Sequence, residues 1–143
     1  MIAPHTFPYT PEEYETEKAS NAYLMSLVVV IVGLPFPIIN LLATWGYFMG
    51  QRKSTYFVRW HCLQALLSQF SVVVINSVGL GWTWSIILTA RPLSNQYIAF
   101  MALAILFNLL EFVATIVTAI ETRKGRHLSW WIYGPLTQLI CKK

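Results

Sequence analysis

The chain has 143 residues, of which 56% are hydrophobic and 11% are charged, and its formal net charge is +4. A soluble domain usually carries about a quarter charged residues, so the composition excludes an ordinary soluble domain and indicates an integral membrane protein. The positive charge does not indicate a nucleic-acid partner, because the Lys and Arg residues form short clusters beside apolar runs. The positive-inside rule expects them there, next to anionic lipid headgroups.

The N-terminal part is polar. We divide the chain into a polar N-terminal segment, residues 1–21, and a helical membrane domain, residues 22–143. The N-terminal segment contains four glutamates and no basic region ahead of a short apolar core, so it does not have the pattern of a cleavable signal peptide. Thr10 and Pro11, followed by two glutamates, predict the start of a short helix on the membrane surface.

The first apolar segment covers residues 22–49. As one helix it would be about 42 Å long, more than the hydrocarbon layer of about 30 Å. The sequence LPFP at residues 34–37 interrupts it, because each proline removes a helix hydrogen bond. The segment is therefore either a span kinked against its neighbours, which we favour, or a re-entrant hairpin. The kinked span places the N-terminus outside, and the hairpin places it inside.

A short basic loop, residues 50–54, precedes the second apolar segment, residues 56–90. This segment is too long for one straight span. Gly79 and Gly81 predict a break, and the tryptophans that follow favour a position near the far membrane surface.

The third apolar segment, residues 96–121, contains neither proline nor glycine and is the clearest span. A basic loop follows, with Gly125 as the expected helix stop. The last stretch, residues 128–141, is too short to cross, and its aromatic residues favour a segment in the interface. Both basic loops lie on the cytoplasmic side if two crossings separate them. The prediction is an all-α integral membrane protein with three to four transmembrane or re-entrant helices and a short C-terminal interfacial segment.

Polar side chains recur on one face of the third segment. Glu111 lies near its middle, where a charge costs at least about 2.5 kcal/mol. Side chains at intervals of three or four share a helix face, and here they are Asn108, Glu111, Thr115, Thr118 and Thr122.

The second segment has a matching face with His61, Gln64, Ser68 and Ser71, and Gln69 and Asn76 lie on a neighbouring strip. Ten residues in from the cytoplasmic ends, about 15 Å deep, lie both Glu111 and the group Gln64, Ser68 and Gln69. We therefore expect the two faces to meet and Glu111 to bond to this group.

Two interpretations of these residues stay open. Polar side chains hold membrane helices together by hydrogen bonds, at about 0.6 to 2 kcal/mol each. The alternative is a polar cavity or a groove for a partner. At the start of the second segment, Arg59 is either functional or a snorkelling side chain. His61 is either a pH-sensitive contact or an interfacial polar group.

The sequence contains no motif of an enzyme, such as HExxH, GxSxG or a P-loop. The three histidines are scattered, and Cys62 and Cys141 have no CxxC spacing. We therefore predict no catalytic activity, no cofactor and no metal site.

The sequence YFVRWHCLQALLSQF at residues 56–70 resembles the (F/Y)VRFHxxQALL signature of the Tic-twenty-like family, with Trp60 in place of the usual Phe. The resemblance extends to the proline-interrupted first segment and to FNLLEFVATIVTAIETRKG, residues 107–125, and covers residues 22–141. The family comprises small helical membrane proteins. Its plastid members are linked to protein translocation across the inner envelope, and its bacterial members have no function that can be transferred.

The resemblance implies a non-enzymatic, multi-pass protein of a bacterial inner membrane that assists protein translocation or insertion within a larger complex. Its partners would be the lipid bilayer, other membrane subunits and a translocating polypeptide. In that picture the two polar faces form a groove for an extended peptide. The alternatives are a structural accessory subunit of another complex and, less favoured, an ion or proton path through Glu111 and His61.

Overall fold

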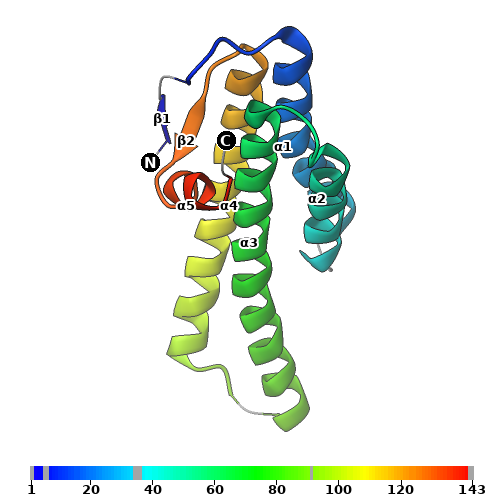
Figure 1. Ribbon diagram of the computed structural model, residues 1–143. Helices are drawn as coiled ribbons and strands as arrows, with labels where there is room; N and C mark the ends of the chain where they lie inside the picture. The colour runs from blue at the N-terminus through cyan, green and yellow to red at the C-terminus, as the bar shows by residue number, and fades with distance from the viewer. Residues whose placement is uncertain (1, 5–6, 34–36, 91, 142–143) are drawn as a thin grey trace.

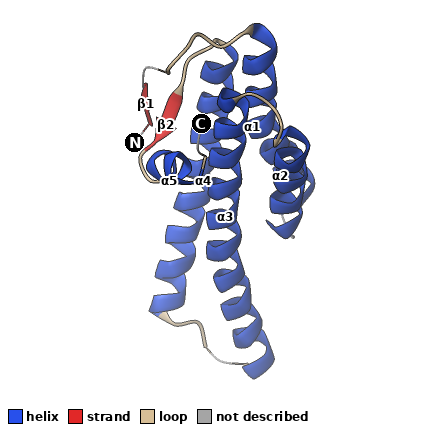
Figure 2. Ribbon diagram, viewed as in Figure 1, coloured by secondary structure: helices blue, strands red, loops and turns tan. Residues whose placement is uncertain are grey.

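The computed structural model describes residues 2–4, 7–33, 37–90 and 92–141. Helices make up most of it (Figure 2), as the all-α prediction requires. A small antiparallel sheet that the sequence did not predict pairs Ile2 with Trp130. In chain order the elements are β1 (Ile2–Pro4), α1 (Glu13–Gly33), α2 (Pro37–Gln51), α3 (Tyr56–Thr89), α4 (Asn95–Arg123), β2 (Leu128–Trp130) and α5 (Tyr133–Ile140).

The two long helices α3 and α4 lie side by side and form the axis of the molecule (Figure 1). In the described part of the chain they are the two helices long and apolar enough to cross a membrane. The other helices and the sheet pack beside the half of this pair that contains the start of α3 (Figure 1). The other half extends beyond them and exposes apolar side chains, such as Val78, Ile87 and Leu103.

The break predicted at Gly79 and Gly81 is absent, because α3 is one helix of 34 residues. A glycine inside a helix costs about 1 kcal/mol relative to alanine, but unlike proline it keeps its backbone hydrogen bond. A Cβ at Gly79 would lie 3.4 Å from the side chains of Phe100 and Met101 on α4, which is an ordinary van der Waals distance. At the far end of α4, Gly125 has a φ of +79° and follows the last turn, as predicted.

The first apolar segment folds into two antiparallel helices instead of the kinked span that we favoured. The Tyr47 hydroxyl, near the end of α2, donates to the Lys18 carbonyl, near the start of α1, at 2.9 Å. Residues 34–36, most of the LPFP sequence, lie outside the described residues. Pro37 opens α2, a position where its missing N–H costs nothing. This hairpin returns the chain to the end at which α1 begins.

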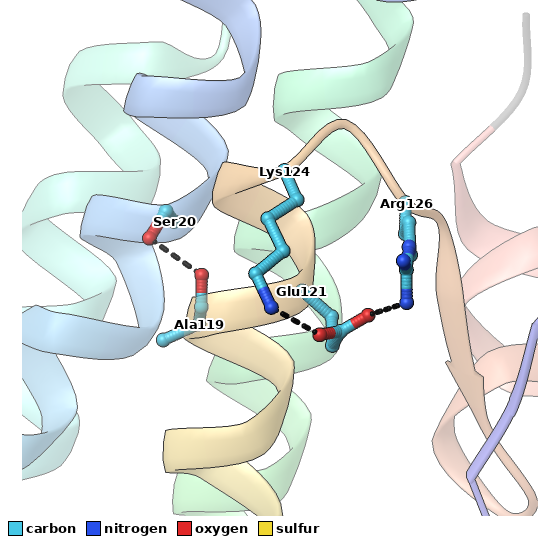
Figure 3. A network of polar contacts seen from close by, with 5 residues as sticks. All are labelled: Ser20, Ala119, Glu121, Lys124 and Arg126. Atoms are coloured by element: carbon cyan, nitrogen blue, oxygen red, sulfur yellow. Dashed lines mark hydrogen bonds and ion pairs between the residues drawn. The ribbon is translucent and has the colours of Figure 1, made fainter.

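The start of α1 differs from the prediction by a few residues. The helix begins at Glu13, and the Glu15 carboxylate caps it by accepting the Glu12 backbone N–H at 2.7 Å. It then continues without a break past residue 22. The Ser20 hydroxyl anchors it to α4 by donating to the Ala119 carbonyl at 2.8 Å (Figure 3).

The loop after α4 is ordered by ion pairs. Glu121 accepts from Lys124 at 2.9 Å and from Arg126 at 2.6 Å (Figure 3). The chain then enters β2, where Trp130 is 6% exposed. We expected the aromatic residues of 128–141 in the membrane interface, but the Trp130 side chain belongs to the core formed by α1, α3 and α4. Trp131 is 77% exposed, and its position in the membrane interface stays a prediction.

Candidate functional site

The polar side chains of α3 and α4 form two separate groups. One surrounds His61 and Gln64, near the start of α3, and we call it the His61–Gln64 network. The other surrounds Glu111 of α4, which meets α3 about one turn beyond Gln64. The sequence placed Gln64 in the second group. This was wrong, because every hydrogen bond that the Gln64 side chain makes with the described residues belongs to the first.

Gln64 is fully buried and holds the backbone of β2. Its Oε1 accepts the Trp130 N–H at 3.1 Å, and its Nε2 donates to the Leu128 carbonyl at 3.2 Å. The same Nε2 donates to the Tyr23 hydroxyl at 2.9 Å. One side chain of α3 therefore ties α1 and the C-terminal segment together.

His61 continues the network. Its Nδ1 lies 2.9 Å from the Tyr23 hydroxyl, and its Nε2 lies 3.1 Å from Nδ1 of His127. Aromatic rings of Phe57 and Trp60 enclose the pair. The sequence treated these two histidines as scattered, but the fold makes them direct neighbours although they are 66 residues apart. His61 is fully buried, so its side chain contacts neighbouring side chains instead of lipid or water.

Tyr23, His127 and Trp130 are partners in this network that the sequence pattern did not predict. Trp130 extends it to α4, because its indole N–H donates to the Thr118 hydroxyl at 2.7 Å. These three residues lie in separate parts of the chain, and helical spacing cannot connect them. A buried polar side chain needs a partner, but a single sequence does not name that partner.

The Glu111 group forms where the two polar faces meet, as the spacing predicted. Oε1 of Glu111 accepts hydrogen bonds from Ser68 at 2.5 Å, Gln69 at 2.9 Å and Thr115 at 3.0 Å. Further along, the side-chain amides of Asn76 and Asn108 bond reciprocally at 3.0 and 2.8 Å. These contacts join α3 to α4 in the middle of both helices. A role for them beyond packing remains a prediction.

The groove that we expected for an extended peptide is absent along these faces. Gln64 is 0% exposed, and Ser68 and Thr115 are each 1% exposed, so the three side chains are covered. The polar faces close on each other instead. A cavity of about 570 Å³ lies beside them, between α2, α3 and α4. Its polar lining consists of Asn40, Gln69, Asn76, Thr83, Asn108 and Glu111.

Arg59 lies in the first turn of α3 and is half-buried. It lies near Cys141 at the end of α5, and its positive charge favours the thiolate of that residue. Burial has the larger effect and raises the pKa of the Cys141 thiol. Within the described residues, no group of three or more His, Cys, Asp or Glu side chains is placed to hold a metal ion.

Comparison with known protein families shows which family the chain belongs to. A model described as the magnetosome magnetite crystal formation protein family, MamF/MmsF, matches residues 17–139. The chain belongs to the MamF/MmsF family. The match covers α2, α3, α4 and β2 completely, together with nearly all of α1 and α5. Searches of curated proteins and of solved structures found no match.

Membership of the MamF/MmsF family corrects the Tic-twenty-like assignment. That assignment rested on the motif at residues 56–70, with further likeness in the first apolar segment and at residues 107–125, whereas a family model matches residues 17–139. The role in protein translocation fails with it, and so does the translocating polypeptide as a partner. The membrane assignment stands, because the chain belongs to the MamF/MmsF family and has two apolar helices of this length. It is a membrane protein that contacts lipid and other membrane proteins.

Proposed function

We propose that this chain takes part in magnetite crystal formation as a non-catalytic, multi-pass protein of the magnetosome membrane. The observation that carries the proposal is the match to the MamF/MmsF family over residues 17–139. Support for the location comes from α3 and α4, which are long enough at about 1.5 Å per residue to cross a hydrocarbon layer of about 30 Å.

The His61–Gln64 network supports a structural role for the end of the molecule that carries the basic loops. Gln64 and Tyr23 join α1, α3 and β2 through buried hydrogen bonds. Such a hydrogen-bonded network favours one arrangement of α1, α3 and β2, because each broken bond leaves a buried polar group without a partner. We propose that the protein presents this fixed surface to other proteins of the same membrane.

The experiment is a gene deletion in a magnetite-forming bacterium that carries this protein, followed by complementation. We expect the deletion to change the number or the diameter of the crystals seen by electron microscopy, and the wild-type gene to restore them. Gln64→Leu, which removes the clamp on β2, should restore them poorly. Gln138→Leu, at an exposed position of α5, should restore them fully.

Location is tested separately. A fluorescent fusion should follow the magnetosomes, and fractionation should place the protein in the magnetosome membrane in preference to the remaining cell inner membrane. Crystals of normal number and size in the deletion strain would refute the proposed function. A fusion spread evenly over the cell inner membrane would refute the proposed location.

A further inference from the structure

The hydrogen bonds of the His61–Gln64 network have a fixed direction, which the backbone of β2 sets. The Trp130 N–H can only donate, so the Gln64 amide turns its oxygen toward it and its nitrogen toward the Tyr23 hydroxyl. In the described part of the chain that hydroxyl has two partners, Gln64 and His61. Because Gln64 is a donor, the hydroxyl proton of Tyr23 points to Nδ1 of His61.

This direction assigns the protons of both histidines. Nδ1 of His61 accepts from Tyr23, so a neutral His61 carries its proton on Nε2. That N–H donates to Nδ1 of His127 at 3.1 Å. Nδ1 of His127 is therefore an acceptor as well, and this ring also carries its proton on Nε2. The complete network thus contains two neutral histidines, which are 0% and 7% exposed.

An additional proton disrupts the network on either ring. On Nδ1 of His61 it would point at the Tyr23 hydroxyl, whose own hydrogen would then have no acceptor. On Nδ1 of His127 it would point at His61, whose proton would have to move from Nε2 to Nδ1 and meet the same hydroxyl. Both cases bury a positive charge and leave a buried donor without an acceptor.

The carboxylates of the chain are not placed to balance such a charge on His61, because Tyr23 and His127 occupy both of its ring nitrogens. The other ionisable groups near the pair are Arg59 and Arg126, which are positive, and Cys62, which is neutral at pH 7. The six acidic residues have other partners or are exposed. Glu15 binds Tyr9, Glu17 binds Arg123, Glu111 binds Ser68, Glu121 binds Lys124 and Arg126, and Glu12 and Glu13 are exposed.

The two histidines fix the chain at its entry to β2. His127 directly precedes the strand, and His61 lies about one turn before Gln64 on α3. We propose that the His61–His127 pair is a pH switch, which holds residues 127–130 on α3 while both rings are neutral and releases them in mild acid. The proposal goes beyond the proposed function and does not rest on it.

The direction of the pH effect follows from proton binding. A released histidine takes up a proton near its ordinary pKa of about 6.5, whereas the complete network has no place for that proton. The released state therefore binds more protons, and lowering the pH below about 6.5 favours it.

Hydrogen exchange of the Trp130 amide, whose N–H is held by Gln64, tests the switch. The purified chain in detergent is measured at pH 7.5 and pH 5.5, and each rate is divided by the intrinsic rate of an unprotected amide at that pH. We expect the protection of Trp130 to be about tenfold lower at pH 5.5, because a released histidine with a pKa of about 6.5 is then mostly protonated. The amide of Thr115, inside α4, should keep its protection.

Variants assign the effect to the histidine pair. His127→Asn keeps a side-chain oxygen that can accept from His61 but cannot take up a proton. The protection of Trp130 should then change by less than about twofold between the two pH values. Glu121→Gln is the matched control, since it removes the carboxylate that binds Arg126, the residue next to His127, and should keep the tenfold decrease.

The ring protons are observed directly in ¹⁵N spectra of the histidines. At pH 7.5 both His61 and His127 should carry their proton on Nε2. A proton on Nδ1 of either ring would refute the fixed direction on which the switch depends. This measurement uses the wild-type chain and decides the question if His127→Asn does not fold.

Equal protection of Trp130 at pH 7.5 and pH 5.5 in the wild type would overturn the proposal. A tenfold decrease that persists in His127→Asn would also overturn it, because another group would then be the one that titrates.

Discussion

The side-chain amide of Gln64 pairs with the backbone of Trp130, 66 residues away, as a neighbouring strand would. It accepts the Trp130 N–H and donates to the Leu128 carbonyl two residues earlier. The backbone of β2 is thus held by β1 through strand pairing and by α3 through the Gln64 side chain, and the Trp130 indole adds a bond to Thr118 of α4. A two-stranded sheet has little stability of its own, so we regard Gln64 as an anchor of the β2 backbone.

Gln64→Leu should loosen this anchor. The substitution leaves the Trp130 N–H and the Leu128 carbonyl without the Gln64 amide, at about 1–3 kcal/mol for each buried group. We expect a Tm lower by several degrees and much faster hydrogen exchange at the amide of Trp130. Gln138→Leu makes the same chemical change at an exposed position and should alter neither quantity. Unchanged exchange at Trp130 in Gln64→Leu would show that Gln64 is not the anchor.

Tyr23→Phe tests the hydroxyl between Gln64 and His61. That hydroxyl is 2.9 Å from both partners, and the side chain is 0% exposed. Its removal leaves His61 Nδ1 without this partner and should lower the free energy of unfolding by about 2 kcal/mol.

Thermal unfolding in detergent measures the effect of Tyr23→Phe. Tyr14→Phe is the control, because Tyr14 is 47% exposed, and its Tm should stay within about a degree of wild type. Equal Tm values for the two variants would mean that the buried hydroxyl contributes no net stability.

Gly134→Ala tests the contact between α5 and β2. A Cβ at Gly134 would lie 1.8 Å from the Ser129 Oγ and 3.1 Å from its Cβ. The hydroxyl can rotate away but the Cβ cannot, so we expect a loss of about 1–3 kcal/mol. The double variant with Ser129→Gly should recover most of this loss, since it removes both atoms.

Gly46→Ala is the matched control for Gly134→Ala and should have the opposite sign. No atom lies within 4 Å of a Cβ built at Gly46, inside α2, so alanine should stabilise the helix by about 0.5–1 kcal/mol. The packing argument fails if both alanine variants shift the Tm in the same direction.

Cys141 should react slowly with iodoacetamide at neutral pH. Burial raises the pKa of its thiol, and a higher pKa means a smaller fraction of the reactive thiolate at pH 7. The rate should therefore increase with pH up to the raised pKa, about tenfold per unit. Arg59→Gln should slow it further, because the positive charge of Arg59 favours the thiolate.

Mass spectrometry of each cysteine follows this alkylation reaction. The chain unfolded in SDS serves as the reference, in which both thiols are accessible. Cys62, which is 1% exposed, should remain unmodified in the folded protein. Alkylation of Cys141 at pH 7 as fast as in SDS would contradict the burial of its thiol.

Local periodicity predicted the contacts between the two long helices. Glu111 meets Ser68 and Gln69 because each lies about ten residues from the same membrane face, on the polar face of a regular helix. The same reasoning failed for Gln64. That residue shares the face, but it is one turn closer to the start of α3, where β2 lies next to it.

Other features depend on how distant segments pack. His61 contacts His127 because the chain after α4 returns along α3, and helical spacing carries no information about that return. Gly79 predicted a break, but α3 continues through it beside Phe100 and Met101 of α4. The prolines at residues 34–37 correctly predicted an interruption, but tertiary contacts such as Tyr47 to Lys18 decided between a kink and a hairpin.

The unequal lengths of the helices have a consequence for the lipid around them. The α1–α2 hairpin, α5 and the sheet all pack beside one half of the α3–α4 pair, and the other half stands without them (Figure 1). With that pair across a bilayer, each copy takes up more area in one leaflet than in the other. A tapered shape of this kind packs with less strain in a bent sheet of lipid than in a flat one.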